Sequence, residues 1–310
     1  MVVLAAACHR VPDPGPGDTL PVDYVAPPAD SVLTGVAYGP DPEHLIDVYR
    51  PPAAGGPAPV IVWLHVGGWL SGSRQQVPEL LLRQVDRAGI AIVSADFRRS
   101  RFEGSTIVNR HPAPSQDVDR LVRWLRVNGP ALGLDDERIL VAGASSGGHL
   151  AALAGAAPGL HTDPTLPADL LAQDPTPAGV MVVSASLDLA YQVTAPGIEG
   201  NASRGYLACS TTPCDPAHVA SASPIAQVRA DSSPAYIVAG AHDTYVPPPR
   251  HATAYVPVLR RAVVGRDAVA GQSSIWYDLV EDGGHNLENQ LNTTELERWI
   301  DLVLVGTWSG

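Results

Sequence analysis

The sequence predicts an α/β fold in which a mostly parallel central sheet is covered by helices on both faces. Short, continuous apolar runs recur along the chain, and segments with helical apolar spacing alternate with them. Continuous apolar runs are typical of parallel strands buried on both faces, and helices usually connect such strands. Glycine-rich or polar turns follow several of these runs, at the sheet edge where parallel sheets place their ligand sites.

Length and composition narrow the classes of protein to consider. The chain has 310 residues, of which 45% are hydrophobic and 17% are charged, as in folded globular proteins. Its net charge of −12 disfavours nucleic acids and anionic membrane surfaces as partners. No apolar run approaches the roughly 18 residues that a membrane-spanning helix needs. The three cysteines form no C-x-x-C pair, so we expect no metal site.

The first thirty residues differ in composition from the rest. A short apolar stretch precedes Cys8, as at the end of a bacterial lipoprotein signal whose cysteine becomes lipidated, although no basic region comes before it. Residues 11–29 are rich in Pro, Gly and Asp and predict an extended tether. We expect residues 1–30 to be a truncated lipoprotein-type signal remnant and tether, and residues 31–310 to form the folded domain. The protein is then exported, and is either anchored to the bacterial cell envelope through Cys8 or secreted; an accidental Ala-Cys pair is the alternative.

The elements follow one another in a clear order. Residues 32–39 and 45–49 alternate in polarity around a Pro-rich turn and predict an antiparallel hairpin at a sheet edge. The remaining segments are predicted from their apolar spacing, with strands at 60–64, 90–94, 139–141, 180–183, 235–239 and 275–279, and helices at 75–87, 116–128, 250–264 and 287–304.

Residues 187–223 interrupt the alternation of strands and helices. The segment is irregular, and we interpret it as an insertion that forms a partial lid over the site. It contains Cys209 and Cys214, which we expect to pair in an exported protein; two free thiols are the alternative for a cytosolic one. A disulfide that closes so small a loop adds only about 2 kcal/mol to the free energy of unfolding, through the entropy of the unfolded chain. The bridge would therefore shape the lid more than stabilise the whole fold.

The stretch 139–157 carries the strongest chemical signal. An apolar run leads into Gly143-Ala144-Ser145-Ser146-Gly147, and an Ala/Leu-rich helical segment follows. A G-x-S-x-G motif between a strand and a helix is the context of a nucleophile elbow. Side chains at Gly143 and Gly147 would clash with the neighbouring strand or helix, and their absence lets Ser145 adopt a strained, exposed conformation. The motif alone occurs by chance in about one such chain in six, so its partners decide its meaning.

A serine nucleophile needs a base and a carboxylate that orients the base. His285 follows a glycine-rich turn after the strand at 275–279, and Asp243 follows the strand at 235–239. Both are therefore predicted at the sheet edge that carries Ser145. The alternatives that we considered are His149, His242 and His251 for the base, and Asp188, Glu281 and Asp282 for the acid.

A tetrahedral intermediate also needs amide donors. One is the amide of Ser146, directly after the nucleophile, and the others are the amides of Gly67 and Gly68, which follow the strand at 60–64. Donors of this kind each contribute about 3–4 kcal/mol to lowering the barrier. The alternative is that these glycines only form a turn at the end of the strand. That alternative leaves unexplained why the turn lies where amide donors are needed.

These motifs together resemble the hormone-sensitive-lipase-like branch of the α/β-hydrolase esterases, close to bacterial carboxylesterases. The order Ser, Asp, His agrees with that fold. The resemblance runs from about residue 36 to residue 304 and includes the segments Leu45 to Pro51, His65 to Trp69, Asp96 to Arg98, His111 to Ala113, Asp117, Trp124, Gly143 to Leu150, Ser223-Pro224, Asp243 with Val246-Pro247, and Gly284-His285.

The resemblance implies an α/β-hydrolase fold and a serine carboxylic-ester hydrolase that works through an acyl-enzyme without metal or organic cofactor. The implied partner is a small-molecule ester, of short-chain or small aromatic type. Val66 replaces the first glycine of the family's usual His-Gly-Gly-Gly, so Val66 and the adjacent Trp69 are candidate pocket residues. Asp117 is implied to anchor a loop beside the site. An amide hydrolase of the arylformamidase type and an inactive lipid-anchored binding protein are the alternatives; the sequence makes no prediction of oligomeric state.

Overall fold

The computed structural model describes residues 31–52, 56–209, 213–263, 268–269, 272–288 and 290–305. Cys8 and the predicted signal remnant and tether, residues 1–30, lie outside the described residues, and their assignment stays a prediction. No helix in the described part of the chain is both long enough and apolar enough to cross a membrane.

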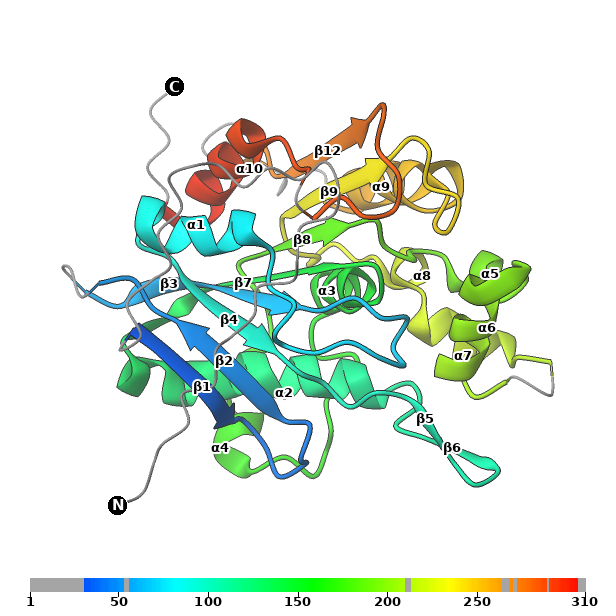
Figure 1. Cartoon of the computed structure of the whole chain (residues 1–310), viewed down its shortest axis with the longest axis horizontal. Coiled ribbons are helices and arrows are strands. Elements are labelled where there is room, and N and C mark those ends of the chain that lie inside the picture. The colour runs from blue at the N-terminus through cyan, green and yellow to red at the C-terminus, as the bar shows by residue number, and fades with distance from the viewer. Residues whose placement is uncertain are drawn as a thin grey trace, which may run out of the picture.

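An eight-stranded sheet forms the centre of the molecule (Figure 1), with the strand order β1-β2-β4-β3-β7-β8-β9-β12. β2 pairs antiparallel with β1 and with β4, and every other neighbouring pair of this sheet is parallel. This confirms the predicted mostly parallel sheet with a hairpin at one edge. The strands are β1 (Val32–Ala37), β2 (Leu45–Tyr49), β3 (Ala58–Leu64), β4 (Ala91–Ala95), β7 (Leu134–Ala144), β8 (Gly179–Val183), β9 (Ala235–Gly240) and β12 (Ile275–Val280).

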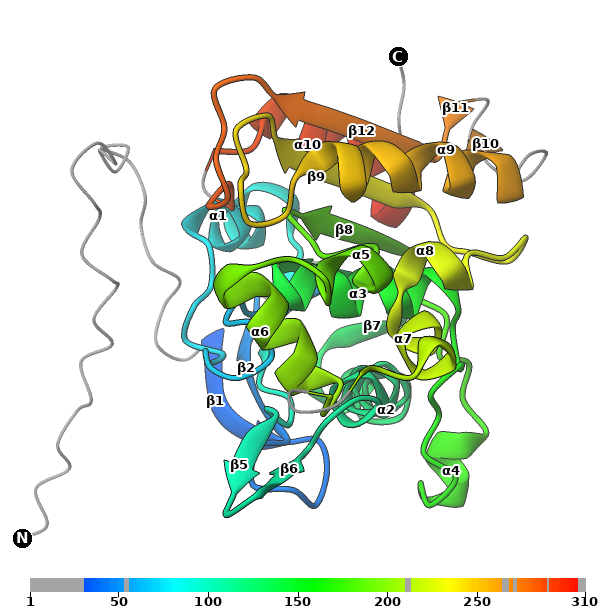
Figure 2. The same cartoon turned by 90° about the vertical axis from the view of Figure 1, so that its right-hand side faces the viewer.

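Helices cover both faces of the sheet, as Figures 1 and 2 show. Along β3, Val60, Val62 and Leu64 pack into one apolar cluster, and Ile61 and Trp63 pack into the other, because successive side chains of a strand point to opposite faces. The first cluster includes side chains of α2 (Ala113–Asn128), α3 (Ser146–Ala156) and α9 (Ala252–Ala262), and the second includes side chains of α1 (Glu79–Ala88) and α10 (Thr293–Ile300).

Several helix boundaries differ from the prediction. α1 begins at Glu79 and not at residue 75, because Pro78 precedes it with an extended ψ of 134°. α10 begins at Thr293 and not at residue 287, since the side chain of Asn292 caps it by accepting a hydrogen bond from the amide of Glu295.

The minor elements are β5 (Arg101–Glu103), β6 (Thr106–Val108), α4 (Ala168–Leu171), α8 (Pro224–Gln227), β10 (Ala268–Val269), β11 (Gln272–Ser273), the short helices η2 (Gly129–Leu132) and η3 (Pro248–Arg250), and the π-helix η4 (Asp301–Val305).

The predicted lid segment, residues 187–223, is more helical than its sequence indicates. It contains α5 (Leu189–Gln192), α6 (Gly197–Tyr206) and α7 (Pro216–Ala222). Glycine disfavours helices, and α6 has three glycines, so contacts with the rest of the protein decide its structure. The fully buried ring of Tyr206 stacks on Trp69 with a centroid distance of 4.7 Å. Cys209 and Cys214 form the predicted disulfide.

Tight packing of α3 on the sheet yields a first prediction. A Cβ at Gly155 of α3 would lie 2.6 Å from Cγ1 of Val180, a stiff and buried side chain of β8. We expect Gly155→Ala to lower the free energy of unfolding by about 1–3 kcal/mol, as overpacking does. The matched control is Gly129→Ala, where φ is −55° and the nearest contact of the added Cβ is an ordinary 3.5 Å. Urea denaturation measures both variants, and equal stability of the two would contradict the packing argument.

Candidate active site

Close backbone packing holds Ser145 in a strained conformation. The serine has φ 52° and ψ −117°, between the end of β7 at Ala144 and the start of α3. A Cβ at Gly147 would lie 2.1 Å from the carbonyl oxygen of Leu64, and one at Gly143 would lie 2.4 Å from the carbonyl carbon of Gly147. Neither position accepts a side chain. Strain of this kind persists only where its surroundings enforce it, and it is typical of catalytic sites.

The structure brings Ser145, His285 and Asp243 together in one chain of hydrogen bonds. Nε2 of His285 lies 3.1 Å from Oγ of Ser145, and Nδ1 of His285 lies 2.8 Å from Oδ2 of Asp243. The other carboxylate oxygen, Oδ1, accepts the amides of Tyr245 and Val246, each at 2.9 Å. Because an ionised carboxylate only accepts, the imidazole donates from Nδ1, which leaves Nε2 as the acceptor for the serine hydroxyl. This is the arrangement of a base that can take a proton from Ser145.

Two of the three other histidines considered as the base have hydrogen-bond partners elsewhere. His149 is fully buried, with Nε2 donating to the carbonyl oxygen of Ala222 and Nδ1 accepting the indole N–H of Trp69. His251 accepts the amides of Leu187 and Asp188 at Nδ1. The third competitor, His242, is exposed on the loop before Asp243.

The other carboxylates considered as the partner of the base are not hydrogen-bonded to His285 in the described residues. Asp188 accepts the amide of Tyr191 and caps α5. Glu281 and Asp282 are exposed. Asp117 has a fully buried carboxylate that accepts hydrogen bonds from His44 and from the backbone and guanidinium of Arg98, so it ties α2 to the segment after β4.

Ser145 and His285 open into a cavity of about 410 Å³. The cavity also contains the predicted pocket residues Val66 and Trp69, although the indole of Trp69 is mostly covered, and the whole residue is 3% exposed. The lining residues are Val66, Gly67, Gly68, Trp69, Leu70, Ser71, Ala144, Ser145, Ser186, Gln192, Ile198, Glu199, Ala202, Tyr245, Val246, His285, Asn286 and Glu288. A concave site that is mostly apolar, with a few polar groups, is typical of small-molecule binding.

The three predicted amide donors lie close to the serine in the fold. Gly67 and Gly68 line the cavity with Ser145, and Ser146 is the first residue of α3. Within the described residues, none of these three amides donates to a protein acceptor. Positive φ angles of 132° at Gly67 and 61° at Gly68 give the loop its shape.

The lid segment and the loop after His285 supply residues that the sequence did not mark as functional. Gln192, Ile198, Glu199 and Ala202 come from the lid segment, and Glu288 follows His285 by three residues. The position of Glu288 beside the predicted base is a signal that could have identified it. No comparable signal exists for the lid residues, because helix α6 is not evident from its sequence.

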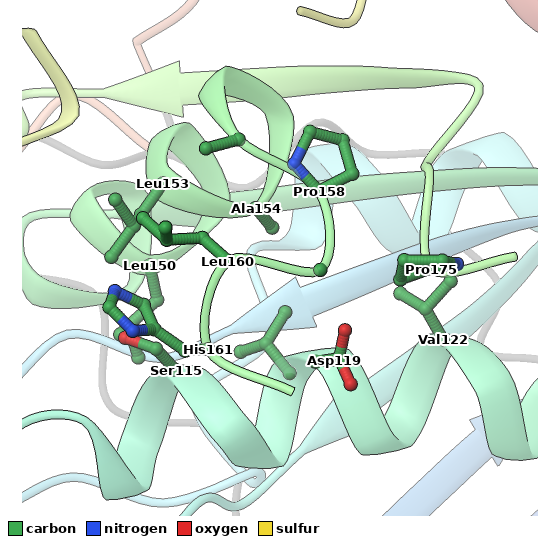
Figure 3. Close-up of a pocket in the computed structure, with 13 residues that line it drawn as sticks. Ser115, Asp119, Val122, Leu150, Leu153, Ala154, Pro158, Leu160, His161 and Pro175 are labelled. Atoms are coloured by element: carbon green, nitrogen blue, oxygen red, sulfur yellow. The ribbon is translucent and has the colours of Figure 1, made fainter. Parts of the chain in front are cut away.

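A second cavity, of about 20 Å³, lies between α2 and α3 (Figure 3). Leu150, Leu153 and Leu160 are among its lining residues, together with the polar side chains of Asp119 and His161. A space of this size holds about one water molecule. Ser145 and His285 do not line it, so the larger cavity is the candidate active site. In the described part of the chain, no group of three or more His, Cys, Asp or Glu side chains is arranged to hold a metal ion.

The chain matches the BD-FAE family over residues 46–255, which is more than half of its length. The chain belongs to this family of α/β-hydrolase esterases. It is 33% identical to Esterase LipC of Mycobacterium tuberculosis over 49% of this chain and 39% of LipC. It is 30% identical to Esterase LipQ of the same organism over 68% of this chain and 49% of LipQ. The matches thus span less than half the length of these two relatives.

Solved structures confirm the predicted α/β-hydrolase fold. A truncated form of a carbohydrate esterase from gut microbiota superposes with a TM-score of 0.70 at 22% identity, covering 90% of this chain and 99% of that one. The apo form of esterase 2 from Thermogutta terrifontis superposes with a TM-score of 0.66 at 20% identity, covering 92% of this chain and 98% of that one.

Three buried histidines make the folded state sensitive to acid. Burial, with a contribution from neighbouring histidines, lowers the pKa of His111 to about 2. Burial also lowers the pKa values of His149 and His251 to about 4. An unfolded histidine has a pKa of about 6.5, so the unfolded chain binds more protons than the folded one below that pH. The stability that the neutral histidines contribute is therefore present above pH 6.5 and is lost as the pH falls toward 4.

We expect the free energy of unfolding to fall between pH 6.5 and 4.5, with each of these histidines contributing up to about 1.4 kcal/mol per pH unit. His111→Asn removes one contribution and should flatten the slope by up to that amount. His242→Asn, at an exposed position, is the control and should leave the slope unchanged. Urea denaturation at several pH values measures the slopes. An unaltered slope in His111→Asn would show that His111 does not stay neutral in the folded protein.

Proposed function

We propose that this protein is a serine carboxylic-ester hydrolase with Ser145 as nucleophile, His285 as base and Asp243 as the carboxylate that orients the base. The observation that carries the proposal is the hydrogen-bonded chain of these side chains, which ends at a strained serine in a cavity. The family and the curated relatives, which are named esterases, support the same chemistry.

The proposed reaction has two halves. Ser145 attacks the ester carbonyl while Nε2 of His285 takes its proton, and the imidazolium that forms is stabilised by Asp243. The imidazolium then protonates the leaving alcohol, and an acyl group remains on the serine. In the second half His285 activates a water molecule, which attacks the acyl group and releases the acid. The reaction needs neither metal nor organic cofactor.

The amides of Gly67, Gly68 and Ser146 are proposed to hold the negative oxygen of the tetrahedral intermediate. Gly147 packs closely against the carbonyl oxygens of Leu64 and His65. This contact supports the proposed role, because it holds the start of the glycine loop (residues 65–68) against the turn that carries Ser145. Donors that are held in place before the reaction stabilise the developing charge without reorganising.

The proposed substrates are short-chain or small aromatic esters. A cavity of about 410 Å³, whose lining includes Val66 and the buried Trp69, suits a small ligand. We also propose that the protein is exported, with a lipid anchor at Cys8 or as a secreted form. The Cys209–Cys214 disulfide supports export, because disulfides persist in oxidising compartments.

We expect Ser145→Ala to reduce the hydrolysis of p-nitrophenyl acetate by at least about 10³-fold while leaving the fold intact, because the nucleophile is lost. The control is Ser105→Ala, at an exposed serine in the turn between β5 and β6. Steady-state kinetics and circular dichroism test both variants. Substantial turnover by folded Ser145→Ala would refute the assigned nucleophile, and hydrolysis of anilides but not of esters by the wild type would favour an amide hydrolase.

Val66 is expected to limit the length of the acyl group. Val66→Ala removes two carbons from the cavity wall and should raise kcat/KM for the hexanoate relative to the acetate ester several-fold, by enlarging the pocket. The measurement is a series of p-nitrophenyl esters from acetate to palmitate. Val77→Ala, a partly buried valine outside the cavity lining, is the control. An unchanged chain-length profile in Val66→Ala would place the acyl group elsewhere.

A further inference from the structure

We propose that the cavity contains a polar subsite that favours esters carrying a protonated amine. This inference rests on the proposed function, since it names a substrate class for the same cavity. It stands on three features that the triad mechanism does not use: two carboxylates on the cavity wall, a buried carboxamide oxygen without a partner, and the absence of a basic side chain from the lining.

The two carboxylates belong to Glu199, in the first turn of α6, and to Glu288, in the loop that follows His285. Both line the cavity and both are partly buried. Within the described residues neither side chain forms a salt bridge, whereas most of the other glutamates described pair with an arginine. In the described part of the chain, no basic side chain therefore neutralises these two carboxylates beside the cavity.

The carboxamide belongs to Gln192, at the end of α5, which lines the same cavity and is 1% exposed. Its Nε2 donates to the carbonyl oxygen of Tyr245 at 3.3 Å, which fixes the orientation of the amide. Its Oε1 is buried and has no hydrogen-bond partner within the described residues. A buried acceptor without a donor costs about 1–3 kcal/mol, so a ligand that supplies an N–H or O–H gains by reaching it.

The remaining lining residues agree with a cationic donor. No Arg is among the residues that line the cavity, and the chain contains no Lys. Ser186, next to the start of the lid segment, also lines the cavity and is 5% exposed. Tyr245, 50% exposed, also lines the cavity, and cations are attracted to aromatic rings.

A protonated amine satisfies these groups together, because it donates up to three hydrogen bonds and carries a positive charge. A neutral hydroxyl satisfies Gln192 but gains little from Glu199 and Glu288. An anionic group meets two carboxylates with no compensating cation and is repelled. The structure therefore ranks otherwise equal esters in the order cationic, neutral donor, anionic.

A matched set of phenyl acetates tests this order, since all share one acyl group and differ only at the para position. The four probes carry aminomethyl, hydroxymethyl, ethyl and carboxymethyl groups, and the aminomethyl group is protonated at pH 7. We expect kcat/KM for the aminomethyl ester to exceed that for the hydroxymethyl ester by about fivefold or more at low salt, and the carboxymethyl ester to be slowest. Raising the salt concentration should reduce the preference, because the charges are partly exposed.

Variants locate the preference. Glu199→Gln and Glu288→Gln should each lower the aminomethyl-to-ethyl ratio of kcat/KM several-fold, because each removes one negative charge from the subsite. Gln192→Met, similar in size, should lower both the aminomethyl and the hydroxymethyl ratios. Glu137→Gln, at a side chain that is 85% exposed near the start of β7, is the control and should change no ratio.

The outcomes separate the two proposals. Hydrolysis of the ethyl ester with no preference for the aminomethyl ester, or a preference that survives both glutamate substitutions, would overturn the subsite and leave the esterase intact. Failure of the folded wild type to hydrolyse any of the four esters would instead overturn the proposed function.

Discussion

The contact on which the rest of the site depends is the packing of Gly147 against the backbone of Leu64 and His65. A Cβ at this position would lie 2.1 Å from one carbonyl oxygen and 2.6 Å from the next, so only glycine fits. The contact presses the first turn of α3 onto the end of β3. The contact thereby fixes both the strained backbone of Ser145 and the start of the glycine loop (residues 65–68), directly after β3. One close approach of two backbones therefore positions both the proposed nucleophile, Ser145, and the candidate amide donors.

A second close approach positions the base. β9 and β12 are parallel neighbours in register, with Gly240 opposite Val280, so their following loops start at the same level. A Cβ at Gly240 would lie 2.1 Å from the carbonyl oxygen of Gly284. The loop that carries His285 therefore packs directly on the end of β9, within hydrogen-bonding reach of Asp243. Parallel register and a small residue at the strand end together explain why residues 42 positions apart meet.

The sheet, and the meeting of Ser145, Asp243 and His285 at its edge, could be predicted because their signals are local. Buried parallel strands are continuous apolar runs, and Ser145, Asp243 and His285 each follow one of them. The lid segment could not be predicted in the same way. Helix α6 contains glycines that disfavour helices, and its place is set by Tyr206 stacking on Trp69, a contact between distant parts of the chain. The part of the cavity lining that includes Gln192 and Glu199 could therefore not be predicted from the sequence.

The central claim is that Ser145 carries the acyl group, and mass spectrometry of the acylated protein tests it most directly. The protein is mixed with p-nitrophenyl acetate, quenched in acid within the first turnover and digested, and the modified residue is located by fragmentation. The account predicts one acetyl group on Ser145 and none in the Ser145→Ala protein. An acetyl group on another side chain that forms at the rate of turnover, or equal acetylation of Ser145→Ala, would contradict it.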